Sequence, residues 1–390
     1  MKRLFTSIAI CLAAICSMQA QELANFNFGG RQQPVISPEI QGDSVTFRFR
    51  ADYATYVKLS GSWMANPYGD SIDMTRGANN VWSVKLPLPS PEIYTYNFVV
   101  DGVSVNDPQN ILVQRDGTRF LNMLLVPGER TANYVEANQR GTVSHPWYDS
   151  KVLGINRRLT VYTPYGYENN PKKKYPVLYL LHGAGGDEEA WISMGRTAQI
   201  LDNLIEKGLA EPMIVVMPNG NANQQAAVTL NIPTKPQQYD RNAMQSLPEP
   251  ERTRAMNSYV VSLCEEIVPF IEKNYRVIAK PEARAIAGLS MGGGHTISAS
   301  NLYPQMFDYI CPLSAAGSAT AEQVATLKKA GVKLYFLACG DADFLFEGSK
   351  TLDKTLTEQG LDHIFYVSDG GHVWANWRLY LNTFAPMLFK

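Results

Sequence analysis

The sequence has 390 residues, of which 45% are hydrophobic and 18% are charged. A chain of this length and composition can bury a large core and is expected to form two domains. The formal net charge of −1 argues against a protein that binds nucleic acid or another polyanion, because such proteins concentrate Lys and Arg on one surface.

The first twenty residues have the pattern of a secretory signal peptide. Lys2 and Arg3 precede the apolar run LFTSIAICLAAIC, and small and polar residues follow this run. The run is too short to span a bilayer, and we expect cleavage after Ala20. A lipoprotein anchor at Cys16 is disfavoured by the bulky Ile15 before it. We therefore expect a periplasmic or extracellular protein without a membrane span.

The next segment alternates between polar and apolar residues with a period of two, as in SVTFRFRA, YVKLSGSW, NVWSVKLPL and IYTYNFVV. Turn signals such as NPYGDS and RGANN separate these runs. Short strands at this spacing are typical of an all-β sandwich of the Ig-like type. We assign this sandwich to residues 21–127 and assign residues 128–150, which are polar and lack periodicity, to a linker that enters the second domain.

Residues 151–390 show a different rhythm. Continuous apolar runs such as PVLYLLHG, PMIVVMPNG and KLYFLACGD alternate with helical patterns such as GRTAQILDNLIEKG and SKTLDKTLTEQG. Buried strands separated by amphipathic helices indicate a parallel sheet covered by helices on both faces. The predicted fold class is therefore α/β, a doubly wound sheet preceded by an all-β sandwich.

The stretch AIAGLSMGGGHT indicates a nucleophile at a sharp turn between a strand and a helix. Ser290 lies between Gly288 and Gly292, in the pattern Gly-x-Ser-x-Gly. The glycines allow the backbone to bend and its neighbours to approach, which leaves the serine hydroxyl exposed at the carboxyl edge of the sheet. A serine hydroxyl needs a base to become a strong nucleophile.

The base and its supporting acid are expected on later strands, in the order serine, acid, histidine. His372 ends the last predicted strand on a glycine loop, and we assign it as the general base. Asp341 and Asp343 both follow the strand LYFLACG, where an acid that orients the base is expected. Position alone does not choose between these two residues. His295 lies one turn into the helix after the serine and is expected to be packed.

The loop in LLHGAGGDEEAW is expected to help bind the oxyanion of an acyl-transfer intermediate. The backbone N–H groups of Gly183 and Ala184, with that of Met291, are the expected donors. No cysteine and histidine spacing suggests a metal site, so no metal or other cofactor is expected. The cysteines beyond the leader are expected in the core, with a bridge between Cys311 and Cys339 left open.

At these residues the chain resembles the esterase-D-like branch of the α/β-hydrolases and, within it, feruloyl esterases from plant-cell-wall degraders. The matching segments include LLHGAGGDEEAW, AIAGLSMGGGHT, ACGDADFL and GGHVWANWR, over about residues 135–390. The resemblance implies that Ser290 is the nucleophile and His372 the base. In this family the acid lies three residues after the glycine that ends its strand, here Gly340, which selects Asp343.

The first domain resembles Ig-like modules related to glycogen-binding domains, through VWSVKLPLP, IYTYNFVVDG and DPQN. Such modules often precede these esterases. Trp82, Tyr94 and Tyr96 alternate as core residues do, whereas Trp63 and Tyr68 lie in a turn-rich segment. We therefore take Trp63 and Tyr68 as the candidate platform for stacking a glycan.

Four side chains near the predicted triad are candidate substrate contacts, namely Asp187, Trp191, Leu289 and Trp374. The segment of residues 222–256 is long, polar and rich in Pro and Gln. Loops of this length are usually functional or disordered. Because it follows a strand that ends at the active-site edge, we expect it to form a lid or side wall.

These observations predict a secreted serine esterase that releases ferulate and related hydroxycinnamates from arabinoxylan through an acyl-enzyme. The expected partner is plant cell-wall polysaccharide, and no nucleic acid is expected. An acetyl-xylan esterase and a siderophore trilactone esterase of the enterobactin type are alternatives with the same machinery. A glycan-binding protein without activity and an acyltransferase are further alternatives.

Overall fold

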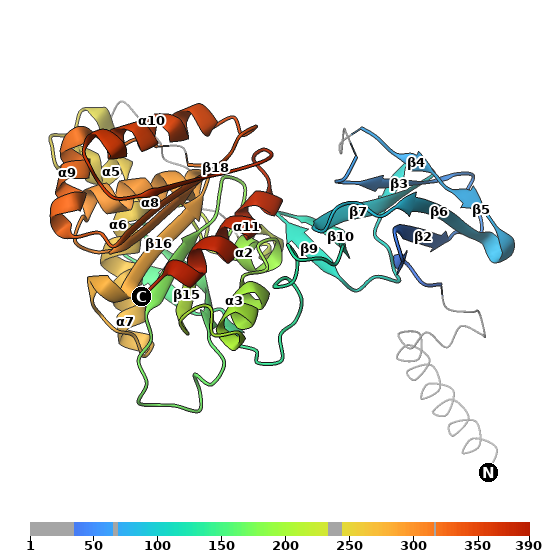
Figure 1. The fold of residues 1–390 in the computed structure, drawn as a ribbon, viewed down its shortest axis with the longest axis horizontal. Helices are drawn as coiled ribbons and strands as arrows, with labels where there is room; N and C mark the ends of the chain where they lie inside the picture. Colours follow the sequence, from blue (N-terminus) through green and yellow to red (C-terminus); the bar gives the residue numbers. More distant parts are fainter. Residues whose placement is uncertain (1–34, 65–68, 233–243, 316) are drawn as a thin grey trace, which may run out of the picture.

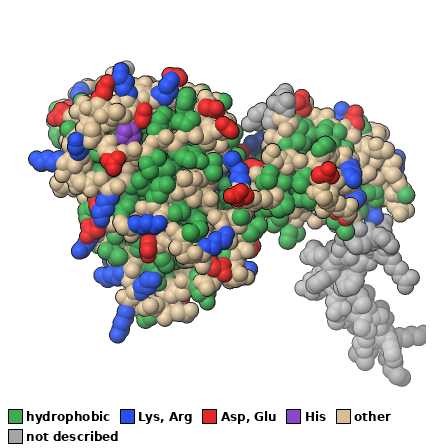
Figure 2. Space-filling model, viewed as in Figure 1, with side chains coloured by type: hydrophobic (Ala, Val, Ile, Leu, Met, Phe, Trp, Pro, Cys, Tyr) green, Lys and Arg blue, Asp and Glu red, His purple; other side chains and the backbone are tan. Residues whose placement is uncertain are grey.

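The computed structural model describes residues 35–64, 69–232, 244–315 and 317–390 (Figure 1). The expected signal peptide lies outside the described residues. Among the described residues, no helix is both long and apolar enough to cross a bilayer. On the face drawn in Figure 2, basic and acidic side chains are interspersed, in agreement with the balanced charge of the chain.

The N-terminal part consists of two antiparallel sheets. The first has the strand order β1-β2-β6-β5 and contains Glu39–Gln41, Ser44–Arg50, Val81–Pro87 and Thr75–Arg76. The second has the order β4-β3-β7-β10-β9, with β8 beside β7, and contains Ile72–Asp73, Val57–Gly61, Ile93–Val100, Arg119–Leu125, Val113–Asp116 and Val103–Val105.

The two sheets bury their alternate residues against each other. Phe47 of β2, Leu59 of β3 and Phe98 of β7 are fully buried in one apolar cluster. Inward-facing apolar residues on both sheets explain the period of two in the sequence. The strands predicted from that period are confirmed, whereas the Ig-like type of the sandwich stays a prediction.

The C-terminal part is built on one large sheet with the order β11-β13-β15-β14-β16-β17-β18-β19, and with β12 beside β13. Its strands are Thr142–Ser144, Ile155–Thr163, Ile214–Pro218, Val177–Leu181, Arg284–Leu289, Tyr309–Leu313, Leu334–Gly340, Ile364–Ser368 and, for β12, Trp147–Ser150. Strands β14 to β19 run parallel to one another, as predicted, whereas β13 is antiparallel to β15. Both β11 and β12 fall within residues 128–150, so this expected linker already contributes strands to the large sheet.

Helices cover both faces of the large sheet (Figure 1). One face carries α6 (Ser258–Ser262), α7 (Val268–Asn274), α8 (Met291–Leu302), α9 (Ala321–Ala330) and α10 (Phe346–Glu358). The other face carries α2 (Ala190–Ser193), α3 (Thr197–Glu206) and α11 (Trp374–Phe384). The short helix α5 (Glu251–Met256) precedes α6.

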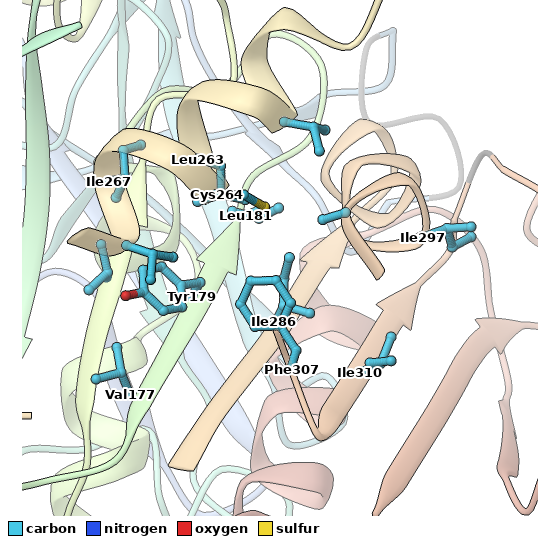
Figure 3. Close-up of a cluster of buried hydrophobic side chains, with 14 of the residues drawn as sticks. Val177, Tyr179, Leu181, Leu263, Cys264, Ile267, Ile286, Ile297, Phe307 and Ile310 are labelled. Atoms are coloured by element: carbon cyan, nitrogen blue, oxygen red, sulfur yellow. The ribbon is translucent and has the colours of Figure 1, made fainter. Parts of the chain in front are cut away.

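The central strand β14 contributes side chains to the hydrophobic cores on both faces of the large sheet. Val177, Tyr179 and Leu181 point into the cluster shown in Figure 3, where they meet side chains from α6 to α8. Leu178 and Leu180 point into the opposite cluster with α3 and α11. A strand buried on both faces must be apolar at every position, which explains the continuous run VLYLL.

The three described cysteines are buried and free, so the bridge between Cys311 and Cys339 is not formed. Burial raises the pKa of the Cys311 thiol far above its usual range. The thiol is therefore protonated and unreactive, which agrees with the expected role of these residues in the core.

Candidate active site

Ser290 occupies the sharp turn between β16 and α8. Its backbone angles are φ 53° and ψ −115°, a conformation that residues with a side chain rarely adopt. The turn is held by a hydrogen bond from the Ser290 N–H to the Leu313 carbonyl, at 2.9 Å. A Cβ atom on Gly292 would lie 2.6 Å from the carbonyl oxygens of Leu181 and His182. The turn thus needs glycine at this position, as predicted from the Gly-x-Ser-x-Gly pattern.

His372 and Asp343 form a hydrogen-bonded pair at the ends of β19 and β18. His372 Nδ1 lies 2.9 Å from Asp343 Oδ2 and 3.1 Å from Oδ1. The Asp343 side chain has no exposed surface, whereas His372 is partly exposed. Because an ionised carboxylate only accepts hydrogen bonds, Nδ1 carries the proton and Nε2 is left as an acceptor. Asp341 instead accepts a hydrogen bond from the Gly370 N–H, at 3.0 Å.

Two aromatic rings hold the imidazole of His372. The centroid of Phe344 lies 4.5 Å from that of His372, and the centroid of Trp377 lies 4.9 Å away with its ring nearly perpendicular. Trp377 is buried and donates a hydrogen bond to Ser314 Oγ at 3.2 Å. The histidine is therefore oriented both by a carboxylate and by packing.

Ser290 and His372 line the same cavity, which has a volume of about 680 Å³. Gly183 and Ala184 line it as well. A Cβ atom on Gly183 would lie 3.2 Å from the Ser290 Cβ, so the glycine loop passes directly beside the serine. The backbone N–H of Met291, the first residue of α8, has no acceptor within the helix. The backbone N–H groups of these residues stay the predicted donors to an oxyanion next to Ser290.

His182 supports the glycine loop from below, a role that the sequence analysis did not assign. Its Nδ1–H donates to the Gly183 carbonyl and its Nε2 accepts from the Gly220 N–H, both at 2.7 Å. Burial lowers the pKa of His182, so the ring is neutral and this tautomer is retained. The only available signal was a histidine directly before the glycines in LLHGAGG.

Two of the four expected substrate contacts lie in the cavity and two do not. Leu289 and Trp374 line the cavity. Trp191 is buried and donates its indole N–H to the Leu181 carbonyl at 2.9 Å. Asp187 is also buried and is paired with Arg115. Neither of these two side chains faces the cavity, which corrects the expectation.

The expected glycan platform stays a prediction. Trp63 stacks on Phe47 at 5.5 Å and packs against the core of the N-terminal sheets. Its ring is partly buried by these contacts. Tyr68 lies outside the described residues. None of the described residues of the segment 222–256 is among those that line the cavity, so the expected side wall is not formed by them.

Part of the cavity wall comes instead from the N-terminal sheets. Its cavity-lining residues include Ser62, Tyr94, Asn97, Gln114, Asp116 and Arg119. The two parts of the chain are joined beside the cavity by Glu92, which pairs with Arg378 of α11 at 3.0 Å. Local sequence patterns did not reveal this wall, because they contain no information on which distant segments meet.

His295 and His363, the other two histidines that follow Ser290 in the sequence, make other contacts. The His295 ring lies 4.6 Å from that of Tyr259, and desolvation of the ring lowers its pKa to about 4. His363 is partly buried and is paired with Asp353 at 2.9 Å. In the described part of the chain, no group of three or more His, Cys, Asp or Glu side chains could hold a metal ion.

Comparisons with known proteins agree with this architecture. Residues 150–331 match the model of the family Esterase. The chain is 29% identical over 373 residues to an endo-1,4-beta-xylanase/feruloyl esterase of Xylanibacter ruminicola, covering 93% of this chain and 47% of that protein. A solved structure of a ferulic acid esterase is 30% identical to the chain, with a TM-score of 0.52. The match covers 64% of this chain and 98% of the ferulic acid esterase.

A crystal structure of an enterobactin esterase from Shigella flexneri covers 90% of this chain, with a TM-score of 0.60 and 15% identity. At this identity the match shows a shared fold, and it extends over both parts of the chain. The chain spans about half of the length of the Xylanibacter ruminicola relative, 47% of it. The chain belongs to the esterase family of α/β-hydrolases and resembles the feruloyl esterases in it.

Proposed function

We propose that the protein is a serine carboxylesterase that hydrolyses hydroxycinnamoyl esters, such as ferulate esters, on arabinoxylan. The observation that carries the proposal is that Ser290 and the His372–Asp343 pair meet at one cavity beside a glycine loop. The related feruloyl esterases support the acyl group, and the xylanase joined to one of them supports the polysaccharide.

The proposed reaction has two halves that share one oxyanion site. His372 Nε2 takes the proton of Ser290 as its Oγ attacks the ester carbonyl carbon. The N–H groups of Ala184 and Met291, with that of Gly183, receive the developing oxyanion. When the intermediate collapses, the sugar oxygen leaves with the proton from His372, and the acyl group stays on Ser290.

In the second half, His372 takes a proton from a water molecule, which attacks the acyl carbon. Collapse of this intermediate returns the proton to Ser290 Oγ and releases the hydroxycinnamate. Asp343 stabilises the imidazolium that forms twice in each cycle. All atoms come from the ester and water, so no cofactor enters the scheme.

The two sides of the cavity suit the two parts of such a substrate. Leu289 and Trp374 offer an apolar and aromatic surface for the hydroxycinnamoyl ring near Ser290. Tyr94 and Asn97, which line the cavity from the N-terminal sheets, offer a ring and an amide for the sugar. We place the leaving group there.

The same proposal covers the organisation of the chain. Residues 1–20 would be a cleaved leader that directs the protein to the periplasm or outside the cell. Residues 21–127 would form an Ig-like module, and residues 151–390 the esterase domain, with residues 128–150 entering its sheet. The partner of the whole would be plant cell-wall polysaccharide or its oligosaccharides.

A panel of esters tests the proposal. Methyl ferulate, feruloylated arabinoxylan, acetylated xylan and enterobactin are incubated with the wild type and with Ser290→Ala. We expect release of ferulate by the wild type and none by the variant. Acetate release alone would instead favour an acetyl-xylan esterase. Binding to xylan without hydrolysis of any ester would refute an enzymatic role.

The siderophore alternative rests on the fold shared with the enterobactin esterase. To bind that substrate the cavity would need unpaired cationic side chains, because an iron-chelating tri-catecholate carries several negative charges. The two arginines that line this cavity are paired, Arg119 with Asp116 at 2.7 Å and Arg378 with Glu92 at 3.0 Å. These paired charges favour a neutral sugar ester, and enterobactin in the panel checks this.

A further inference from the structure

An arginine of the N-terminal sheets reaches into the glycine-loop region of the esterase sheet. Arg115 lies on β9 and its side chain is buried. Its guanidinium donates two parallel hydrogen bonds to Asp187, from Nη1 to Oδ2 at 2.8 Å and from Nη2 to Oδ1 at 2.6 Å. Such a two-pronged contact fixes both position and direction. A third bond, from Nε to Glu189 Oε2 at 3.2 Å, extends the contact.

Asp187 closes the same turn that carries the oxyanion donors. The Gly186 N–H donates to the Gly183 carbonyl at 3.2 Å, so residues 183–186 form one tight turn, and Asp187 follows it directly. The Asp187 carboxylate also accepts from the Glu189 N–H at 3.0 Å. The turn is thus held by His182 at its start and by the Arg115–Asp187 pair at its end.

The pair belongs to a larger buried ion network. Glu189 also contacts Arg158 of β13, and Arg158 Nε donates to Glu188 Oε1 at 2.7 Å. Glu188 in turn accepts from Asn219 Nδ2 at 3.0 Å. All members except Asn219 are charged, and the three carboxylates share two guanidinium groups.

Removing Arg115 would therefore leave an unbalanced cluster. Three adjacent carboxylates would share one remaining cation, Arg158, and Asp187 is only 3% exposed to water. A buried carboxylate without a partner is strongly unfavourable, so the turn would move to hydrate it. Burial alone would lower the pKa of Arg115, yet hydrogen bonds and charge from Asp187 raise it above the ordinary value.

We propose that Arg115 is a positioning residue, which holds the oxyanion-binding turn of the esterase in place from the N-terminal sheets through Asp187. The proposal rests on the proposed function, because it concerns the donors of that reaction. It makes the N-terminal part a component of the catalytic apparatus, in addition to its contribution to the cavity wall.

The test compares Arg115→Gln and Arg115→Lys with Arg48→Gln. Arg48 is a matched control, because it also lies in the N-terminal sheets and pairs with a glutamate, Glu39, at 2.7 Å, but does not line the cavity. With methyl ferulate we expect kcat to fall by about 10-fold to 100-fold in Arg115→Gln, with KM changed less than about threefold, since loss of one oxyanion donor costs about 10² to 10³ in rate. Arg115→Lys should recover part of the loss, and Arg48→Gln should match the wild type.

A second readout separates positioning from folding. A trifluoromethyl ketone with an aryl group forms a tetrahedral adduct with the serine, whose oxyanion needs the same donors. Its inhibition constant should rise in Arg115→Gln by about the factor by which kcat/KM falls, whereas thermal unfolding should still be cooperative. Asp187→Asn combined with Arg115→Gln should lose much less than the product of the two single losses, because both act through one contact.

The outcomes distinguish this proposal from the proposed function. If the wild type hydrolyses methyl ferulate but Arg115→Gln keeps kcat and inhibitor affinity within twofold, the positioning role is refuted while the esterase stands. If Arg115→Gln loses activity only in proportion to unfolded protein, while the folded fraction binds the inhibitor as the wild type does, the role is structural and the proposal also fails. If the wild type hydrolyses no ester, the proposed function fails first.

Discussion

Replacing Asp343 by asparagine is the sharpest test of the proposed base. Asp343 Oδ1 accepts a hydrogen bond from the Leu345 N–H at 2.9 Å, and Oδ2 is the atom nearest to His372 Nδ1, also at 2.9 Å. In the variant the Leu345 N–H will hold the amide oxygen, which directs the amide NH₂ at Nδ1. The proton of His372 then moves to Nε2, and the ring cannot accept the proton of Ser290.

We expect kcat to fall by about 10⁴, as the wrong tautomer does in serine hydrolases, which corresponds to about 5 kcal/mol in the activation free energy. The amide has nearly the same shape as the carboxylate, so the unfolding temperature should change little. The loss should diminish at high pH, where hydroxide can replace the base. Steady-state hydrolysis of methyl ferulate over a range of pH measures both effects.

Asp341→Asn is the matched control. Asp341 lies two residues away and accepts from the Gly370 N–H through one oxygen, a bond that asparagine can also accept. Its kcat should stay within about threefold of the wild type. The reasoning is refuted if Asp343→Asn keeps more than a tenth of the activity, or if Asp341→Asn is equally damaging.

Three further substitutions have defined outcomes. Gly292→Ala should cost about 1–3 kcal/mol in calorimetry and impair turnover, since its Cβ would collide with the carbonyls of Leu181 and His182; wild-type behaviour would contradict the described turn. His295 has a pKa of about 4 in the folded chain against 6.5 in the unfolded chain, so between these values only the unfolded chain gains this proton. The free energy of unfolding therefore decreases by up to about 3 kcal/mol as the pH is lowered from 6.5 to 4. His295→Phe should flatten that dependence in unfolding titrations, and an unchanged slope would exclude it. Tyr94→Ala should raise KM for feruloylated oligosaccharide about threefold to tenfold but not for methyl ferulate, and an equal rise for both would place the sugar elsewhere.

Local patterns were sufficient for the elements and for the turn at Ser290. The period of two in the N-terminal strands, which buries residues such as Phe47 and Leu59, predicted the sandwich. The continuous apolar run of β14 predicted the parallel sheet, because a strand buried on both faces is apolar at every position. The position of Ser290 between β16 and α8 was predicted from adjacent glycines. The α/β-hydrolase fold and the likeness to feruloyl esterases are confirmed by the comparisons.

The choice between neighbouring side chains needed more than local patterns. Asp341 and Asp343 both follow β18, and position did not separate them until the family pattern was used; in the structure Asp343 contacts His372. Asp187 and Trp191 lie in the motif LLHGAGGDEEAW, yet both side chains point away from the cavity. A one-residue difference in register at the end of a strand changes where a side chain points, and sequence spacing does not resolve it.

The sequence by itself therefore determined the fold class, the turn at Ser290 and the order of the three candidate triad residues, because these depend on short-range stereochemistry and burial. Only the tertiary structure decided that the N-terminal sheets form a wall of the cavity and that Arg115 reaches Asp187. Contacts between residues more than seventy positions apart depend on how two folded surfaces fit together. No local periodicity of charge or hydrophobicity encodes that fit.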